Sequence, residues 1–196
     1  MPDEILRTFI AVELDETLRI AIASVQEKLK RQVPPGSVKW VAPGGIHLTL
    51  KFLGDTPSAR LTDIQAALLA ACAGFVASEF GVEGQGCFPD FRRPRVIWVA
   101  VKDRGQALAR LQAAVERHIS PLGWPTEERA FSPHLTLGRI SRGADSQAAA
   151  AVGRAVEKSV IERIGVQRVS TVSLIRSDLQ PTGPIYTSLL NVPLSV

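Results

Sequence analysis

The tetrapeptide His-Leu-Thr-Leu occurs at residues 47–50 of this chain and again at residues 134–137. The two copies are 87 positions apart, from 134 minus 47. A motif that returns after a long interval is typical of a duplicated unit, and a duplication predicts that the flanking segments also match at that interval. They do match, so the chain of 196 residues is interpreted as one unit made twice.

Each motif lies within the same succession of predicted elements: strand, helix, strand, helix, strand. The opening strands are rich in β-branched and aromatic residues, and the helices have apolar residues at helical spacing. Asp145 or Ser146 is suited to cap the last helix. The segments that flank the motifs are 7–14, 15–31, 58–74 and 79–88 in the first half, and 95–101, 104–119, 145–164 and 166–176 in the second.

This pattern predicts an α+β fold that is bilobal, with two lobes related by a pseudo-twofold axis. Each lobe is expected to be a mainly antiparallel sheet with helices on its outer face, around a central cleft. Only a turn region at 89–94 separates the halves. We therefore expect a single domain, 1–196, built from repeats at about 7–88 and 95–176, with the site in the cleft.

Composition narrows the class of protein. Apolar residues make up 45% and charged residues 21%, as in ordinary globular proteins. The net charge of +4 favours anionic partners. No stretch approaches the roughly 18 apolar residues of a membrane span, and no basic segment followed by an apolar one opens the chain. We expect a cytoplasmic monomer that contacts no membrane, with both cysteines reduced.

The motif residues are expected to alternate between the two faces of a strand. Side chains at i and i+2 share a face, so His47, Thr49 and Lys51 are predicted to point the same way. The opposite face is predicted to be buried, and it consists of Ile46, Leu48, Leu50 and Phe52. In the second copy, His134 and Thr136 share the polar face. Each half therefore offers an imidazole beside a hydroxyl.

Two imidazoles and two hydroxyls around one point suit a tetrahedral anion such as a phosphodiester. Opening a cyclic phosphate needs a base for the incoming water and an acid for the departing sugar oxygen. An unperturbed imidazole titrates at about 6.5, so it can serve in either role. No Asp, Glu or Cys stands at ligand spacing from the motif histidines, so we expect no metal site and no cofactor.

At these residues the sequence resembles the two-histidine phosphoesterase superfamily, and within it the RNA 2',3'-cyclic phosphodiesterases that are also called 2'-5' RNA ligases. The resemblance covers nearly the whole chain. It is carried by Arg7-Thr-Phe-Ile-Ala, Ile46-His-Leu-Thr-Leu-Lys-Phe-Leu-Gly, Arg95-Val-Ile-Trp-Val, Phe131-Ser-Pro-His-Leu-Thr-Leu-Gly-Arg, Ser177, Gly183 and Tyr186.

The resemblance implies hydrolysis of a 2',3'-cyclic phosphate to a 2'-phosphate without a metal. Carried onto this chain, it makes His47 the proton donor and His134 the proton acceptor. The residues alone leave these roles interchangeable, because the two motifs are identical. Thr49 and Thr136 are expected to donate hydrogen bonds to the phosphate. The expected partners are RNA with 2',3'-cyclic phosphate ends or small cyclic nucleotides.

Six further residues are candidates for substrate binding, each with a structural alternative. Lys51 shares the predicted face of His47, whereas Arg139 reaches the cleft only if its strand ends or bulges at Gly138. Arg95 could guide an RNA backbone, although a charged turn is usually only solvated. The aromatic candidates could stack on a base or lie in the core, and they are Phe9, Trp40 and Tyr186.

Two other functions stay open on the sequence alone. An RNA ligase would join ends through a 2'-5' bond and yield a longer strand. A non-catalytic nucleotide- or RNA-binding module would use the same cleft and release its ligand unchanged.

Overall fold

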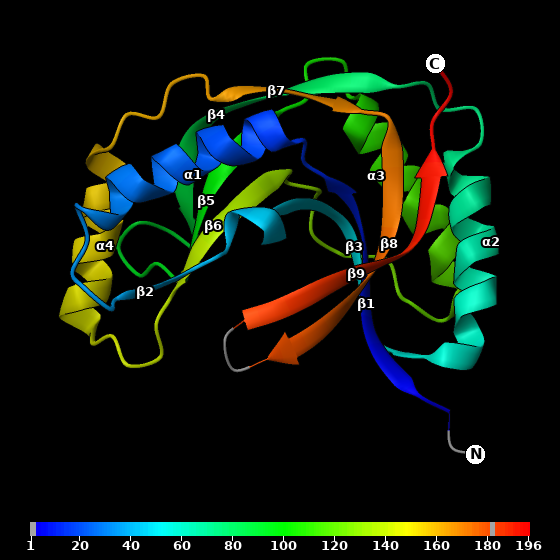
Figure 1. Ribbon diagram of the computed structural model, residues 1–196, viewed down its shortest axis with the longest axis horizontal. Helices are drawn as coiled ribbons and strands as arrows, with labels where there is room; N and C mark the ends of the chain where they lie inside the picture. Colours follow the sequence, from blue (N-terminus) through cyan, green and yellow to red (C-terminus); the bar gives the residue numbers. More distant parts are fainter. Residues whose placement is uncertain (1–2, 181–182) are drawn as a thin grey trace.

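The computed structural model describes residues 3–180 and 183–196, and within these ranges it contains two β-sheets and four α-helices (Figure 1). Every pair of neighbouring strands within the sheets is antiparallel. The strands are β1 (Ile5–Glu13), β2 (Val38–Trp40), β3 (His47–Pro57), β4 (Ser78–Phe88), β5 (Val96–Lys102), β6 (His134–Ile140), β7 (Gly165–Val169), β8 (Thr171–Gln180) and β9 (Gly183–Pro193). The helices are α1 (Glu16–Lys30), α2 (Leu61–Cys72), α3 (Ala107–Ile119) and α4 (Ser146–Lys158).

The two halves of the chain exchange their last strands. One sheet has the order β3-β1-β8-β9 and the other β2-β6-β5-β4-β7, so β4 joins the sheet of the second motif and β8 the sheet of the first. The two exchanged strands pair in the same way. Ala11 of β1 lies opposite Ser173 of β8, and the equivalent residues, Trp98 of β5 and Gly86 of β4, also lie opposite each other at the interval of 87 residues. The α+β, bilobal prediction is confirmed, but each sheet is built from both repeats.

The strand predicted at 166–176 is in fact two strands, β7 and β8, in different sheets. The chain leaves the five-stranded sheet at Val169 and enters the four-stranded sheet at Thr171. Between them, the Ser170 carbonyl accepts a hydrogen bond from the Leu194 amide at 2.9 Å. Both segments are rich in β-branched and other apolar residues. The sequence pattern therefore continues without a break where the chain passes from one sheet to the other.

Helices α1 and α4 begin near their predicted residues because carboxylates cap them. Asp15 accepts a hydrogen bond from the Leu18 amide at 2.8 Å and so caps α1. Asp145 caps α4 in the same way. However, α4 ends at Lys158 and not at 164 as predicted. The chain beyond it runs alongside β4, where the Gln85 side chain accepts a hydrogen bond from the Ile161 amide at 3.2 Å.

The first helix of each half packs against the motif strand of the other half. From α1, the Gln26 amide donates a hydrogen bond to the Leu137 carbonyl of β6 at 2.8 Å. From α3, Glu116 pairs with Lys51 of β3. In Figure 1, α2 and α3 lie side by side at one end of the molecule, and α1 and α4 lie toward the other. Among the residues that the structure describes, thirty-five buried apolar residues from both halves form one continuous core.

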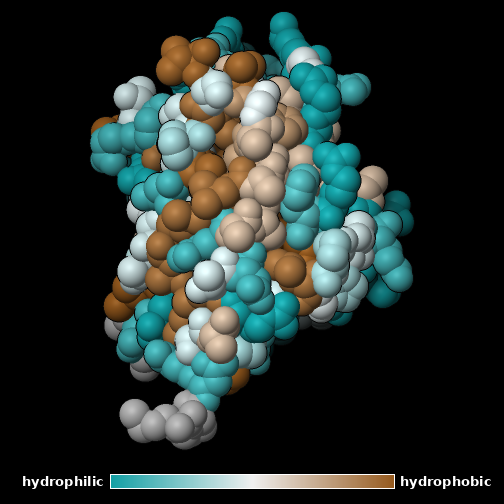
Figure 2. Space-filling model, turned by 90° about the vertical axis from the view of Figure 1, so that its right-hand side faces the viewer, coloured by the Kyte–Doolittle hydropathy of each residue, from teal (hydrophilic) through white to brown (hydrophobic). Residues whose placement is uncertain are grey.

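The outer surface at the end formed by α2 and α3 is partly apolar. Figure 2 views this end and shows a band of hydrophobic residues among polar ones. Leu69 of α2 is 51% exposed and Val76, just beyond the helix, is 62% exposed. In the part of the chain that the structure describes, no helix is both long and apolar enough to span a membrane.

Candidate active site

A β-bulge in β3 changes which side chains share the face of His47. Ala11 of β1 lies opposite Thr49, but its neighbour Ile10 lies opposite Lys51, so Leu50 is an extra residue in the strand. The alternation shifts by one position after the motif. As a result Phe52 turns to the side of His47 and Thr49, where it is 67% exposed.

The second motif has the same bulge at the equivalent residue. Trp98 of β5 lies opposite Thr136 and Ile97 lies opposite Gly138, which leaves Leu137 as the extra residue. The strand therefore bulges directly before Gly138, and Arg139 lies on the face of His134 as an exposed side chain. We call the two faces that carry the motif histidines the open faces of the sheets.

The expectation that Lys51 shares the face of His47 is wrong. The bulge turns Lys51 into the interior, where its side chain is 4% exposed. Its ammonium group lies 2.5 Å from a carboxylate oxygen of Glu116 and donates a second hydrogen bond to the Pro125 carbonyl at 2.8 Å. A buried charge needs such partners, so Lys51 joins β3 to α3 and to the segment that leads toward the second motif.

Gln26 has a comparable place at the second bulge. Its side chain is buried, and its amide nitrogen lies 2.8 Å from the carbonyl oxygens of both Val41 and Leu137. The Leu137 carbonyl also accepts the Val41 amide at 2.9 Å. Each motif strand is thus contacted at its bulge by a buried polar side chain from the first helix of the other half. Glu116 of α3 contacts β3, and Gln26 of α1 contacts β6.

His47 is enclosed by aromatic rings. Phe9, paired with Phe52 across the sheet, stacks on the imidazole with ring centroids 4.4 Å apart. Tyr186 of β9 meets the imidazole edge-on at 5.2 Å and Phe9 at 5.5 Å. A side chain at Gly45 would lie within 3.1 Å of the Tyr186 ring, so a glycine there allows the close approach of Tyr186.

His134 also lies among aromatic rings, but these rings come from positions that are not equivalent in the repeat to those around His47. Phe88 meets its imidazole edge-on with centroids 4.8 Å apart, and Trp98 lies 6.3 Å away. The Trp98 ring occupies the space that a side chain at Gly86 would fill. Each imidazole is therefore placed by packing as well as by its strand.

The backbone fixes the tautomer of both imidazoles. His47 Nδ1 lies 2.9 Å from the Gly45 carbonyl oxygen, and His134 Nδ1 lies 2.7 Å from the Ser132 carbonyl oxygen, again 87 residues on. A carbonyl oxygen only accepts, so each Nδ1 must carry its proton and donate. Each Nε2 is then left to exchange a proton with a bound molecule.

Burial lowers the pKa of His47 to about 4, and the hydrogen bond to the Gly45 carbonyl opposes this shift only in part. The charged imidazole is disfavoured because Phe9 and Tyr186 replace water around it. Without a bound anion, His47 is therefore neutral at pH 7, with its lone pair on Nε2.

The two motif strands, β3 and β6, contact each other where the sheets adjoin, and Tyr186 of β9 lies beside His47. Only the six residues 41–46 separate Trp40, which pairs with Gly138, from His47. Burial raises the pKa of Tyr186, while the positive charges of Arg139 on β6 and Arg7 on β1 lower it. Residues of both halves therefore act at one place.

The remaining two predicted residues are Trp40 and Arg95. Trp40 packs against the core, with the Lys30 ammonium group 5.9 Å from its ring centroid. Arg95 is exposed and stands one position before β5. Strand alternation places it on the side of the buried Ile97. Its backbone carbonyl accepts a hydrogen bond from the Ile140 amide at 3.0 Å.

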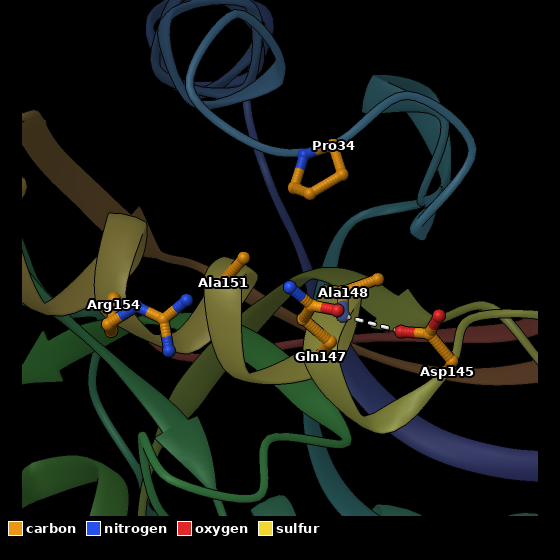
Figure 3. Close-up of a pocket in the computed structure, with 6 residues that line it drawn as sticks. All are labelled: Pro34, Asp145, Gln147, Ala148, Ala151 and Arg154. Carbon is orange, nitrogen blue, oxygen red and sulfur yellow. Dashed lines mark hydrogen bonds between the residues drawn. The ribbon is translucent and has the colours of Figure 1, made fainter.

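A shallow hollow of about 290 Å³ lies elsewhere, at the start of α4. Figure 3 shows the Asp145 carboxylate there, accepting the hydrogen bond from the Ala148 amide that caps the helix. The lining residues are Pro34, Asp145, Gln147, Ala148, Ala151 and Arg154. None of them is a predicted site residue, and the hollow has no part in the histidine site.

Both cysteines are free and buried, and burial raises the pKa of Cys72 to about 11 and that of Cys87 to about 12. Such thiols are poor nucleophiles at neutral pH. Within residues 3–180 and 183–196, no three His, Cys, Asp or Glu side chains gather as they would around a metal ion.

Four side chains around the motif strands are not identified as site residues by the sequence pattern. Phe52 was assigned to the core, and Gln26, Phe88 and Trp98 were not considered for the site. The repeat offered one signal, since Phe52 and Arg139 stand at equivalent places five residues after their histidines. The contacts of Gln26 depend on how α1 packs, which no local pattern reveals.

Two imidazoles with available Nε2 atoms, each beside a threonine on the open face of its sheet, define a two-histidine phosphoesterase. A family model described as LigT like Phosphoesterase matches the chain twice, over residues 12–98 and 99–186. The chain belongs to this family.

Similar proteins agree with this assignment. An RNA 2',3'-cyclic phosphodiesterase of Methanothermobacter thermautotrophicus is 37% identical over 186 residues, covering 94% of this chain and 96% of the relative. One from Archaeoglobus fulgidus is 34% identical, covering 94% and 98%. The crystal structure of TT0787 of Thermus thermophilus superposes with a TM-score of 0.77 at 29% identity, covering 96% and 97%.

The fold is shared more widely still. The crystal structure of Escherichia coli LigT complexed with 3'-AMP also gives a TM-score of 0.77, at 23% identity, and covers 98% of this chain and all of that one. At this identity the likeness concerns the fold alone.

Proposed function

We propose that this protein hydrolyses the 2',3'-cyclic phosphate at the end of an RNA to a 2'-phosphate, by acid–base catalysis with two histidines and no metal. The observation that carries the proposal is the matched pair of Nδ1 hydrogen bonds, which leaves Nε2 of His47 and of His134 available. The names of the relatives at 37% and 34% identity support the substrate class.

In the proposed reaction His134 is the proton acceptor and His47 the proton donor, as the sequence resemblance implies. His134 Nε2 takes a proton from water while the water oxygen bonds to phosphorus. The bond between phosphorus and O3' breaks, and His47 Nε2 gives its proton to O3'. The product has a 2'-phosphate and a free 3'-hydroxyl. Thr49 and Thr136 donate hydrogen bonds to the non-bridging oxygens as charge builds there.

The low pKa of His47 places a condition on this mechanism. At about 4, fewer than about one molecule in a hundred carries the acidic proton at neutral pH. The negative charge of a bound phosphate favours the imidazolium and raises the pKa. We expect inorganic phosphate to raise the NMR titration midpoint of His47 by at least one pH unit. If the midpoint did not move in saturating phosphate, His47 would not be the donor.

The direct test is incubation of an RNA oligonucleotide with a 2',3'-cyclic phosphate end in EDTA, followed by identification of the product terminus. We expect a 2'-phosphate. The variants His47→Ala and His134→Ala should each lose more than about 100-fold in turnover. The matched control is His118→Ala, since His118 lies in α3 and bonds the Ala114 carbonyl.

Other products would point to other functions. A longer strand with a 2'-5' bond would indicate a ligase, and unchanged but bound RNA would indicate a binding module. Activity that EDTA abolishes and a divalent cation restores would overturn the metal-free mechanism.

A further inference from the structure

One of the four buried side chains of α1 is polar, and it lies against both motifs. These side chains, in a helix whose residues are all described, are Leu18, Ile22, Gln26 and Leu29. An apolar residue at position 26 would continue the buried stripe. A buried amide is tolerated only where its hydrogen bonds are made. The glutamine is therefore explained better by what its amide binds than by packing.

The Gln26 amide group bonds to the backbone near each of the two histidines. An amide nitrogen has two hydrogens to donate, and here it lies 2.8 Å from the Leu137 carbonyl oxygen and 2.8 Å from that of Val41. Leu137 is the bulge residue of β6, three positions after His134. Val41 follows β2, on the segment that leads to His47. One side chain thus joins the strand of one histidine to the approach of the other.

The link from Val41 to His47 is short and tightly turned. It contains the 3-10 helix Pro43–Gly45, where the Gly45 amide donates a hydrogen bond to the Ala42 carbonyl at 2.7 Å. The Gly45 carbonyl, at the end of this turn, accepts the hydrogen bond from His47 Nδ1. A displacement of Val41 therefore moves the acceptor that fixes the tautomer of His47.

We propose that Gln26 is a positioning residue, which fixes the two motif histidines relative to each other and holds His47 in its Nδ1–H tautomer through the turn 41–45. Its effect on the rate rests on the proposed function, whereas its effect on the tautomer can be measured without turnover. The base and the acid act on opposite sides of the phosphorus, and a misplacement of about 1 Å can cost about a hundredfold in rate.

The variant Gln26→Met removes both donors and keeps the length of the side chain. For an RNA that ends in a 2',3'-cyclic phosphate, we expect kcat to fall at least about tenfold. KM should change much less, because every group that contacts the substrate is still present. A second variant, Gln26→Asn, keeps a buried amide that is one methylene too short to bridge the two carbonyls, and its kcat should be intermediate.

The matched control is Gln85→Met. Gln85 of β4 is half-buried, and its amide nitrogen also donates to two carbonyls, those of Val156 and Ser159 at the end of α4. It lies opposite Val99, a residue of the core, and its hydrogen bonds hold neither motif. Both Gln26→Met and Gln85→Met should lower Tm, but only Gln26→Met should lower kcat.

The spectroscopic readout is the tautomer of each histidine, given by the imidazole ¹⁵N shifts of labelled protein at pH 7.5 without added anions. In the unmodified protein His47 and His134 should both be in the Nδ1–H form. In Gln26→Met, His47 should gain the Nε2–H form. His134 is the internal control, because its Nδ1 donates to the Ser132 carbonyl and the Gln26 amide bonds elsewhere.

Each outcome bears on a defined claim. A kcat that Gln26→Met leaves intact, an unchanged His47 tautomer, or an equal loss of kcat in Gln85→Met would overturn the positioning role. If Gln26→Met did not fold, the same measurements on Gln26→Asn would decide. Absence of turnover in the unmodified protein would instead overturn the proposed function, and the His47 tautomer would then test the positioning of His47 alone.

Discussion

The burial of His47 makes stability depend on pH in a defined window. The pKa is about 4 in the folded protein and 6.5 ordinarily. Above pH 6.5 neither state binds the proton. Between pH 6.5 and 4 only the unfolded chain binds it, so stability falls as the pH falls. The loss reaches about 2.5 kcal/mol by pH 4.5 and levels off at about 3.4 kcal/mol once the folded protein is also protonated.

Urea unfolding at pH 7.5, 6.0 and 4.5 measures this contribution. The variant His47→Asn cannot titrate, but its amide can still donate to the Gly45 carbonyl. Other groups affect both proteins equally, so the variant should lose about 2.5 kcal/mol less than the unmodified protein between pH 7.5 and 4.5. Parallel curves, or an NMR titration of His47 with a midpoint near 6.5 in the absence of anions, would refute the reasoning.

Other predictions concern the buried contacts and the rate. Lys51→Met should destabilise the protein by about 3–5 kcal/mol, because Glu116 stays buried without its partner, whereas Lys51→Met combined with Glu116→Leu should recover most of the loss in urea unfolding. Gly153→Ala should lower Tm, since the new methyl group would overlap the Phe91 carbonyl; Gly143→Ala, with no atom within 4 Å of the added carbon, is the control, and equal Tm values would contradict the packing. The acid–base pair predicts a bell-shaped dependence of kcat/KM on pH, which a flat profile with chemistry limiting would exclude.

The sequence predicted most of the framework because apolar periodicity and duplication are strong signals. The motif strands and the helices lie within about three residues of their expected places, except that α4 ends six residues early, at Lys158. The family resemblance is confirmed. Two strands were missed. β2 is only three residues long, and β9 is a sheet edge whose half-exposed residues show no clear alternation.

The bulges could not be predicted, and they decide which residues reach the site. In the first copy both Phe52 and Leu53 are apolar, so either alternation would bury a hydrophobic side chain. Lys51 and Arg139 are both long cations, yet one is in the core and the other is exposed. A single extra residue in each strand makes that difference.

Several expectations stay predictions. They include the assignment of donor and acceptor, the independence from metals, the single domain of two repeats, the monomeric state and the cytoplasmic location.

The exchange of the last strands means that a chain cut between β4 and β5 would yield two fragments, neither with a complete sheet. The first fragment would hold β3 and β1 without β8, and the second would hold β6 and β5 without β4. Each fragment supplies the strand that the other lacks. In topology the protein is a strand-swapped dimer whose two subunits have been fused, and a single ancestral repeat could have built the whole two-histidine site only by pairing with a second copy of itself.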